Sequence, residues 1–159
     1  FTLRNGRYNN RRYPKSYCEK MLVQAEGQYT PMHFHWLKSE DIINRGGGTL
    51  VIQLYNASKS EGLARGDVRV STDGVARRVR AGGTLCLKPG ESITLTHHVY
   101  HKFWAEGGPV LLGEVSAVND DRNDNRFYDP LGRFPKIEED EPAQFLLCTE
   151  YPRAGKRGR

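Results

Sequence analysis

The sequence predicts an all-β fold of the sandwich or barrel type. Its strand candidates are short and are separated by turn residues, and no long segment shows a helical period. A chain of 159 residues is long enough to form one domain with a substantial core. Many short strands joined by glycine- and proline-rich turns are typical of sandwiches and barrels.

The strand candidates follow one another between turn signals. Residues 49–56 alternate in hydropathy, which places Val51, Gln53 and Tyr55 on one face. The pair Asp73-Gly74 separates two β-rich segments and predicts a tight hairpin. The predicted strands are Lys20–Glu26, Thr49–Asn56, Asp67–Ser71, Val75–Val79, Thr84–Leu87, Ser92–Leu95, His101–Ala105, Val110–Ser116 and Gln144–Glu150.

Two segments between these strands need separate interpretation. The run Gly46-Gly47-Gly48 has neither dinucleotide-binding nor Walker spacing, so we expect a turn between Ile43 and the strand that starts at Thr49. Residues 119–142 are polar and contain Pro130 and Pro135, which predicts a long irregular loop. The aromatic residues of this loop suggest a lid that packs onto the domain, and the alternative is a flexible surface insertion. They are Phe127, Tyr128 and Phe134.

The charge distribution argues against a nucleic-acid groove. The net charge is +5, but residues 1–20 hold six basic residues and one acidic residue, and the tail from residue 152 to residue 159 holds four more basic ones. Basic ends around an acidic middle do not form a basic stripe on a folded surface. We expect one domain over residues 1–151 and a flexible basic tail over residues 152–159. No apolar run approaches the ~20 residues that a membrane helix needs.

The three cysteines predict a reducing compartment. Cys18, Cys86 and Cys148 are odd in number and widely spaced, which fits reduced thiols in the cytoplasm. Cys86 and Cys148 lie in apolar, strand-like runs and are expected to fill the core. The chain starts at Phe1, without an initiator methionine, so we expect part of the natural N-terminus to precede it.

A cluster of histidines and a glutamate predicts a metal site. His33 and His35 share one face of an extended strand, Glu40 can return to that face across a short bend, and His101 can reach it from a neighbouring strand. Three imidazoles and one carboxylate suit Mn, Fe, Co, Ni or Zn and lack the thiolates of structural zinc sites. In an octahedral site these four ligands leave two positions for a substrate. An isolated H-x-H pair, by contrast, is more often two exposed polar side chains than part of a metal site.

The surroundings of this cluster resemble the cupin family. Gly27, His33, His35, Glu40 and Gly47 give the spacing G-x5-H-x-H-x4-E-x6-G, which is similar to the first cupin motif. Gly90, eleven residues before His101, matches the first glycine of the second motif. Thr96 and His98 stand where cupins usually carry proline and glycine, which makes His97 and His98 rival ligands. The resemblance implies a jelly-roll barrel.

Longer runs resemble the D-lyxose isomerases of the cupin class, nearly to Tyr151. They are TPMHFHWLKSEDIINRGGGTLVIQLYN (30–56), KPGESITL (88–95), YHKFWAEGG (100–108), GEVSAVNDD (113–121) and DNRFYDPLGRFPKIEEDE (124–141). The resemblance implies a metal, usually Mn²⁺, on His33, His35, Glu40 and His101, with Co²⁺, Fe²⁺, Ni²⁺ or Zn²⁺ as alternatives. It also implies a sugar substrate and a homodimer.

The implied reaction is aldose–ketose isomerisation, from D-lyxose to D-xylulose and from D-mannose to D-fructose. The open-chain sugar would offer its C1 and C2 oxygens to the metal, which stabilises the enediolate. A base must then move a proton from C2 to C1. Glu114, an acid in mid-strand, or a glutamate of the long loop is the candidate base, and Lys38 is the candidate partner of a sugar oxygen. Glu139 of the long loop is a candidate for binding the sugar.

Several residues keep an alternative interpretation. Lys38 could be an ordinary surface lysine, and Glu114 could anchor a salt bridge. Trp36, Phe103 and Trp104 could line the sugar site or belong to the core or a dimer contact. Two other functions also fit the ligand set: an Fe(II) dioxygenase and a sugar-binding barrel without catalysis.

Overall fold

The computed structural model describes residues 1–131, 140–142 and 144. These residues form strands and no helix, so the predicted all-β class is confirmed. In this part of the chain there is accordingly no helix that could cross a membrane. The strands are β1 (Thr2–Arg4), β2 (Tyr17–Gln24), β3 (Tyr29–Phe34), β4 (Glu40–Asn56), β5 (Val68–Thr72), β6 (Val75–Val79), β7 (Thr84–Leu87), β8 (Ser92–Leu95), β9 (Val99–Ala117) and β10 (Arg126–Phe127).

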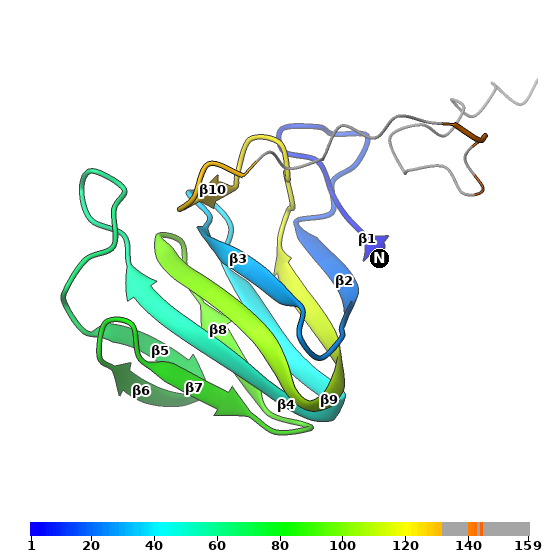
Figure 1. Cartoon of the computed structure of the whole chain (residues 1–159). Helices are drawn as coiled ribbons and strands as arrows, with labels where there is room; N and C mark the ends of the chain where they lie inside the picture. The colour runs from blue at the N-terminus through cyan, green and yellow to red at the C-terminus, as the bar shows by residue number, and fades with distance from the viewer. Residues whose placement is uncertain (132–139, 143, 145–159) are drawn as a thin grey trace, which may run out of the picture.

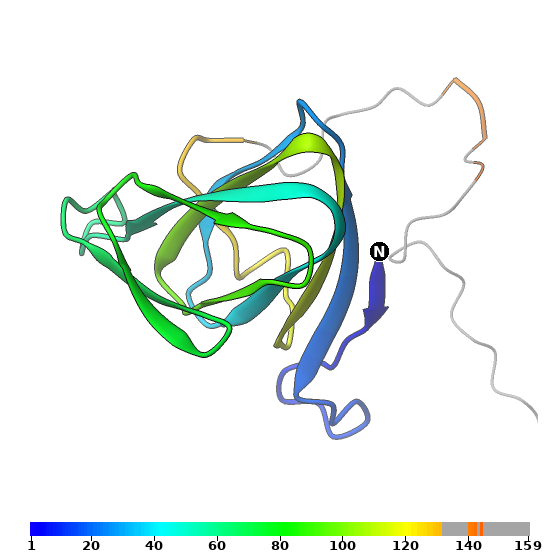
Figure 2. The ribbon, with the colours of Figure 1, turned by 90° about the horizontal axis from the view of Figure 1, so that it is seen from below.

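Two long strands, β4 and β9, organise the barrel. They pair with each other in antiparallel fashion over almost their whole length. The first part of β4 also pairs with β8 and its second part with β7, while the first part of β9 pairs with β3 and its second part with β2. Because both strands bend together, the sheet folds over and its strands curl around a common interior (Figures 1 and 2).

The bend in β4 corrects the prediction of a turn at Gly46-Gly47-Gly48. The glycines lie inside β4, where the register with β9 shifts. Gly47 has φ = 97°, and a Cβ atom placed on it would lie only 2.1 Å from the carbonyl oxygen of Pro109. Glycine is therefore needed because the two backbones approach closely at the bend. The same bend joins the two predicted strands at 101–105 and 110–116 into β9.

The hairpin predicted at Asp73-Gly74 is confirmed. It joins β5 to β6, and both turn residues have positive φ, 49° for Asp73 and 79° for Gly74, as a type I′ turn requires. The strands predicted at 84–87 and 92–95 match β7 and β8. The strand predicted at 144–150, apart from Gln144, and the tail at 152–159 lie outside the described residues.

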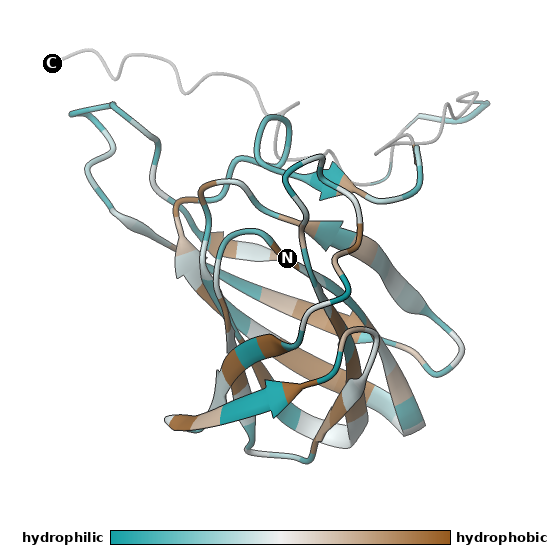
Figure 3. Ribbon diagram, turned by 90° about the vertical axis from the view of Figure 1, so that its left-hand side faces the viewer, coloured by the Kyte–Doolittle hydropathy of each residue, from teal (hydrophilic) through white to brown (hydrophobic). Residues whose placement is uncertain are grey.

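The apolar core lies between the two layers of the folded sheet. In the second half of β4 the fully buried residues are Leu50, Ile52 and Leu54, and the alternate positions Gln53 and Tyr55 on the other face are only partly buried. Figure 3 shows hydrophobic residues along the strands of the barrel and hydrophilic residues in the loops at one end. Other members of the core are Ile42, Val68, Val70, Val79, Leu87, Ile93, Leu95, Val99, Phe103, Ala105, Val110 and Leu112.

One cysteine differs from the prediction. Cys18 is buried, but Cys86 is exposed, so the expectation that Cys86 fills the core is wrong. The reason is the alternation of side chains on β7, where Leu87 is buried and its neighbour Cys86 points to the other face. Cys148 lies outside the described residues.

Candidate metal centre

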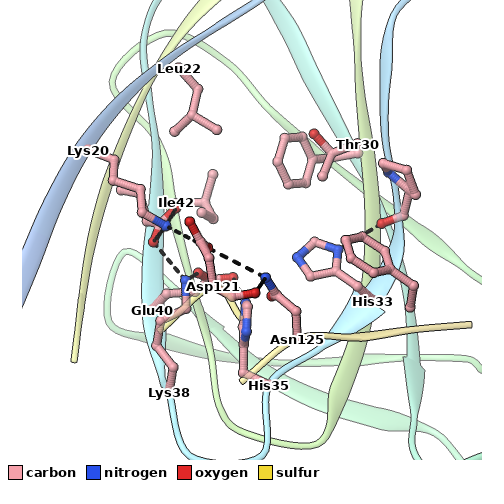
Figure 4. Close-up of a pocket in the computed structure, with 14 residues that line it drawn as sticks. Lys20, Leu22, Thr30, His33, His35, Lys38, Glu40, Ile42, Asp121 and Asn125 are labelled. Atoms are coloured by element: carbon pink, nitrogen blue, oxygen red, sulfur yellow. Dashed lines mark hydrogen bonds and ion pairs between the residues drawn. The ribbon is translucent and has the colours of Figure 1, made fainter. Parts of the chain in front are cut away.

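The four predicted ligands meet inside one end of the barrel. His33 on β3 is the register partner of His101 on β9, His35 follows the end of β3, and Glu40 begins β4. All four side chains are buried, and one donor atom from each lies within 4.8 Å of the others. Figure 4 shows His33, His35 and Glu40 directed into the same pocket. Two layers of the barrel thus contribute to one cluster.

Backbone carbonyls fix the orientation of all three imidazoles. Nδ1 of His33 lies 2.7 Å from the carbonyl oxygen of Pro31, and Nδ1 of His101 lies 2.9 Å from that of Val99. Nδ1 of His35 lies 2.5 Å from the carbonyl oxygen of Asp124. Since a carbonyl only accepts, each Nδ1 carries the proton and each Nε2 keeps a free lone pair. Histidines that bind a metal through one ring nitrogen commonly make such a hydrogen bond through the other.

The inward ring nitrogens lack partners. Nε2 of His35 and Nε2 of His101 are buried and make no hydrogen bond in the described part of the chain. They face Oε1 of Glu40 at 3.6 Å and 3.0 Å. Lone pairs on these nitrogens and on a carboxylate oxygen in a buried site repel each other unless a proton or a metal cation lies between them.

Protonation of the cluster fits the same interpretation. Burial, with the neighbouring imidazoles of His101 and His35, lowers the pKa of His33 well below its ordinary value, so its ring is neutral. Burial by itself would raise the pKa of Glu40, but His101, His35 and Lys38 outweigh it and lower that pKa well below the ordinary value. Neutral imidazoles and an ionised carboxylate are the forms that bind metals.

A divalent transition metal fits these residues. Metal–ligand distances of ~2.1 Å place opposite ligands ~4.2 Å apart, so the donor atoms need to close only slightly around an ion. The orphaned Nε2 atoms of His35 and His101 would gain the partner that they lack. A nitrogen-rich set with one carboxylate and no thiolate does not select a single metal.

Beside the cluster lies a chain of buried charges. Nζ of Lys38 lies 2.6 Å from Oε2 of Glu40 and 2.8 Å from Oε1 of Glu114. Nζ of Lys20 lies 3.0 Å from the same oxygen of Glu114 and 2.6 Å from Oδ1 of Asn119. Burial by itself would lower the pKa of Lys38, but the carboxylates of Glu40 and Glu114 raise it above its ordinary value. Lys38 is therefore a buried ammonium group, not a surface lysine.

Three members of the cluster and the charged groups of Lys20, Lys38 and Glu114 border one cavity of about 280 Å³. Its lining combines ionisable and apolar side chains, and Figure 4 shows Lys20, Leu22 and Ile42 on one side of the cavity and Thr30 and His33 on the other. Its lining comprises Lys20, Leu22, Thr30, Pro31, His33, His35, Lys38, Glu40, Ile42, Phe103, Glu114, Asp121, Asn125 and Phe127. A small polar molecule beside the cluster would contact both the metal ligands and the lysine–glutamate chain.

The predicted aromatic residues separate into two groups. Phe103 lines the cavity because it lies two positions after His101 on β9 and shares its inward face. Trp104 points to the outer face, where its Nε1 donates to Glu106. Trp36 donates through Nε1 to Glu61 and packs against Phe34, outside the cavity. The structure thus brings Phe103, but neither tryptophan, to the site.

The rival histidines and the loop glutamate lie elsewhere. His97 and His98 are exposed and do not belong to the cluster. His98 has φ = 62°, the conformation expected at the cupin glycine position that it occupies. Its backbone N–H donates to the carbonyl oxygen of His35. Glu139 lies outside the described residues.

Sequence reasoning missed several residues of the site. Lys20 reaches the cavity from β2, and Asp121 and Asn125 reach it from the segment after β9. Phe127 of the same segment, one of the aromatic residues predicted to pack onto the domain, also lines the cavity. Asp124 is buried behind His35. The only available signal was that residues 119–142 were expected to fold over a site, and this did not separate one acidic residue from another.

The comparisons with known proteins agree with this geometry. Fold and site together define a cupin-like barrel with a buried histidine–carboxylate centre. The chain belongs to the D-lyxose isomerase family, a family of sugar isomerases, whose sequence model matches residues 1–151. It is 57% identical over 155 residues to a D-lyxose/D-mannose isomerase of Serratia proteamaculans, covering 96% of this chain and 68% of the relative. It is 54% identical over 153 residues to one of Escherichia coli O157:H7, covering 95% and 67%.

Solved structures show the same fold at low sequence identity. L-ribose isomerase of Cellulomonas parahominis matches with a TM-score of 0.55 at 17% identity, over 72% of this chain and 59% of that protein. An L-ribose isomerase variant of Acinetobacter sp. DL28 in complex with L-ribose matches with a TM-score of 0.59 at 16% identity, over 82% and 69%. The chain therefore spans about three fifths of the first of these proteins and about two thirds of the sequence relatives.

Proposed function

We propose that this chain is a divalent-metal-dependent aldose–ketose isomerase that interconverts D-lyxose and D-xylulose, and D-mannose and D-fructose. One observation carries the proposal: in a member of this family, three buried imidazoles and a carboxylate converge beside a cavity that also borders a buried lysine–glutamate chain, and two of the imidazoles have unpaired Nε2 atoms. The names of the two sequence relatives support the choice of sugars. The cavity of about 280 Å³ is near the lower end of ligand pockets, ~300 Å³, which suits a small sugar.

His33, His35, Glu40 and His101 would hold the metal. When bound, it would supply a Lewis acid that polarises the carbonyl and hydroxyl oxygens at C1 and C2 of the open-chain sugar. The apolar residues Leu22, Ile42 and Phe103 would exclude water from the same space, which strengthens every electrostatic contact inside it.

Glu114 is the proposed base. Its carboxylate lies in the cavity wall, and the reaction needs a group that removes the proton from C2 and returns it to C1, while the hydroxyl proton on O2 moves to O1. The ammonium group of Lys38, between Glu40 and Glu114, is placed to donate a hydrogen bond to a sugar oxygen as charge shifts from one carbon to the other. Lys20 would hold Glu114 from the other side.

The proposal also covers the metal, the oligomeric state and the cellular location of the enzyme. Mn²⁺ is the proposed metal, because the resemblance to the D-lyxose isomerases implies it and the nitrogen and oxygen donors of the cluster are compatible with it. A homodimer is proposed from the resemblance to cupin barrels. A cytoplasmic location is proposed because the described cysteines, Cys18 and Cys86, are free thiols.

A sugar panel tests the proposal. The chain is incubated with Mn²⁺ and with D-lyxose, D-mannose or L-ribose, and the ketose product is separated and quantified. We expect turnover of D-lyxose and D-mannose. A chain that carries bound Mn²⁺ but converts none of these sugars would contradict the proposed activity and favour a sugar-binding role.

A further inference from the structure

The segment between β3 and β4 carries much of the site, yet it is not part of a strand. It runs through Trp36, Leu37, Lys38 and Ser39, between the ligands His35 and Glu40. Its two ends are fixed by backbone hydrogen bonds, because the carbonyl oxygen of His35 accepts from the N–H of His98 and that of Ser39 accepts from the N–H of Ala117. The N–H groups in its middle have no such strand partners and need an acceptor elsewhere.

One carboxylate satisfies these N–H groups. Oδ1 of Asp124 accepts from the N–H groups of Trp36 and Leu37, each at 2.9 Å, and Oδ2 accepts from the N–H of Lys38, also at 2.9 Å. Asp124 is only 3% exposed, so these bonds form away from water. Three consecutive N–H groups around a buried carboxylate form charge-assisted hydrogen bonds, which are stronger than neutral ones.

Asp124 also contacts the metal cluster through its backbone. Its carbonyl oxygen accepts from Nδ1 of His35 at 2.5 Å and so holds the proton on that nitrogen. A single buried residue therefore sets the direction of a metal-ligand imidazole and the path of the backbone that carries Lys38. Its neighbours Asp121, Asn125 and Phe127 line the cavity.

We propose that Asp124 is a positioning residue that joins the cavity-lining segment after β9 to the metal ligand His35 and to Lys38, and so sets metal affinity. This inference rests on the proposed metal centre but not on the proposed reaction. If Asp124 moves, His35 loses its second hydrogen bond and the segment from Trp36 to Lys38 loses its anchor, so both the ligand and the ammonium group lose their positions.

Two substitutions and a matched control test this role. Asp124→Asn keeps one oxygen for Trp36 and Leu37 but turns an NH₂ group toward the N–H of Lys38, whereas Asp124→Ala removes all three acceptors. Asp129→Asn is the control, because Asp129 is an exposed aspartate a few residues away whose side chain makes no hydrogen bond or ion pair within the described residues.

The measurement is Co²⁺ binding by competition with a chelator, together with the visible spectrum of the bound Co²⁺, which reports ligand geometry without any sugar. We expect Asp124→Ala to bind Co²⁺ about 10–100-fold more weakly with an altered spectrum, the range typical for partners of metal ligands. Asp124→Asn should lie between Asp124→Ala and the wild type, and Asp129→Asn should match the wild type.

The outcomes separate the two proposals. If Asp124→Asn and Asp124→Ala bind Co²⁺ with wild-type affinity and spectrum, the positioning role is contradicted, even if both variants are less stable to heat. If Asp124→Ala does not fold, Asp124→Asn still decides, because it should show a weaker affinity and an altered spectrum. A wild-type chain that binds Co²⁺ but isomerises no sugar would contradict the proposed activity alone, and one that binds no Co²⁺ would contradict both proposals.

Discussion

The two ends of the barrel interior are equally buried but chemically opposite. At one end Leu50, Ile52 and Val110 are fully buried in an apolar core. At the other end Lys38 and the four members of the cluster are at most 8% exposed although they are charged or polar. Burial of apolar area stabilises a fold, whereas burial of ionisable groups costs free energy unless they are paired. The free energy gained by burying the apolar end therefore offsets the cost of burying the ionisable groups at the polar end.

Removal of a metal ligand should have the largest effect. In His33→Ala the cluster loses one of three imidazoles, so bound metal, measured per chain by elemental analysis, should fall to background and turnover should disappear with it. The chain should remain folded, because the apolar end is unchanged. His97→Ala is the control, since His97 is exposed and outside the cluster. Metal content at the wild-type level in His33→Ala would contradict the ligand assignment.

Glu114→Gln should separate chemistry from metal binding. If Glu114 moves the proton, turnover should fall by ~10²–10⁴-fold while bound metal stays at the wild-type level. The matched control is Glu106→Gln, an exposed glutamate on the same strand. Wild-type turnover in Glu114→Gln would move the role of base to another acid, with a glutamate of the long loop as the next candidate.

A substitution in the apolar end should act on stability. Ile52→Ala removes a fully buried side chain from β4 and should lower the free energy of unfolding by ~2–5 kcal/mol, measured by urea denaturation. Val23→Ala, at an exposed position on β2, should cost less than ~1 kcal/mol. Bound metal per folded chain should be unchanged in both. A loss of metal in Ile52→Ala without a loss of stability would contradict the division between the two ends.

The smallest expected effect compares neighbours on opposite faces of β9. Phe103→Leu removes apolar surface from the cavity wall and should raise KM about fivefold, which corresponds to ~1 kcal/mol of lost contact. Trp104→Leu changes only the outer face and should alter KM by about twofold or less. If Trp104→Leu has the larger effect on KM, the outer face takes part in sugar binding after all.

The local sequence pattern was sufficient to predict the fold class and the hairpin between β5 and β6, but not the bend in β4. Asp73-Gly74 requires positive φ at two consecutive residues and therefore identifies its own turn. The glycines of β4 look like a turn in sequence. Glycine is needed at position 47 because the backbone of Pro109 lies against it, and the sequence does not show that these two distant residues come together.

The same distinction applies to the site. His33, His35 and Glu40 were found because the whole motif lies within eight residues. Asp124 and Lys20 were missed because their contacts join distant segments. Asp124 hydrogen-bonds to residues 86–88 positions away, and Lys20 to Glu114, 94 positions away. Sequence alone therefore identified the candidate ligands but not the groups that hold them.

Reversible metal removal is the most direct test of the central claim. The wild-type chain is stripped with a chelator, assayed on D-lyxose for D-xylulose, and assayed again after Mn²⁺ is restored, with His33→Ala treated in the same way. We expect stripping to abolish turnover, and we expect Mn²⁺ to restore it in the wild type with one ion per chain but not in His33→Ala. Turnover that persists in the fully stripped chain, or that Mn²⁺ restores equally in His33→Ala, would contradict the claim that this cluster is the centre of the reaction.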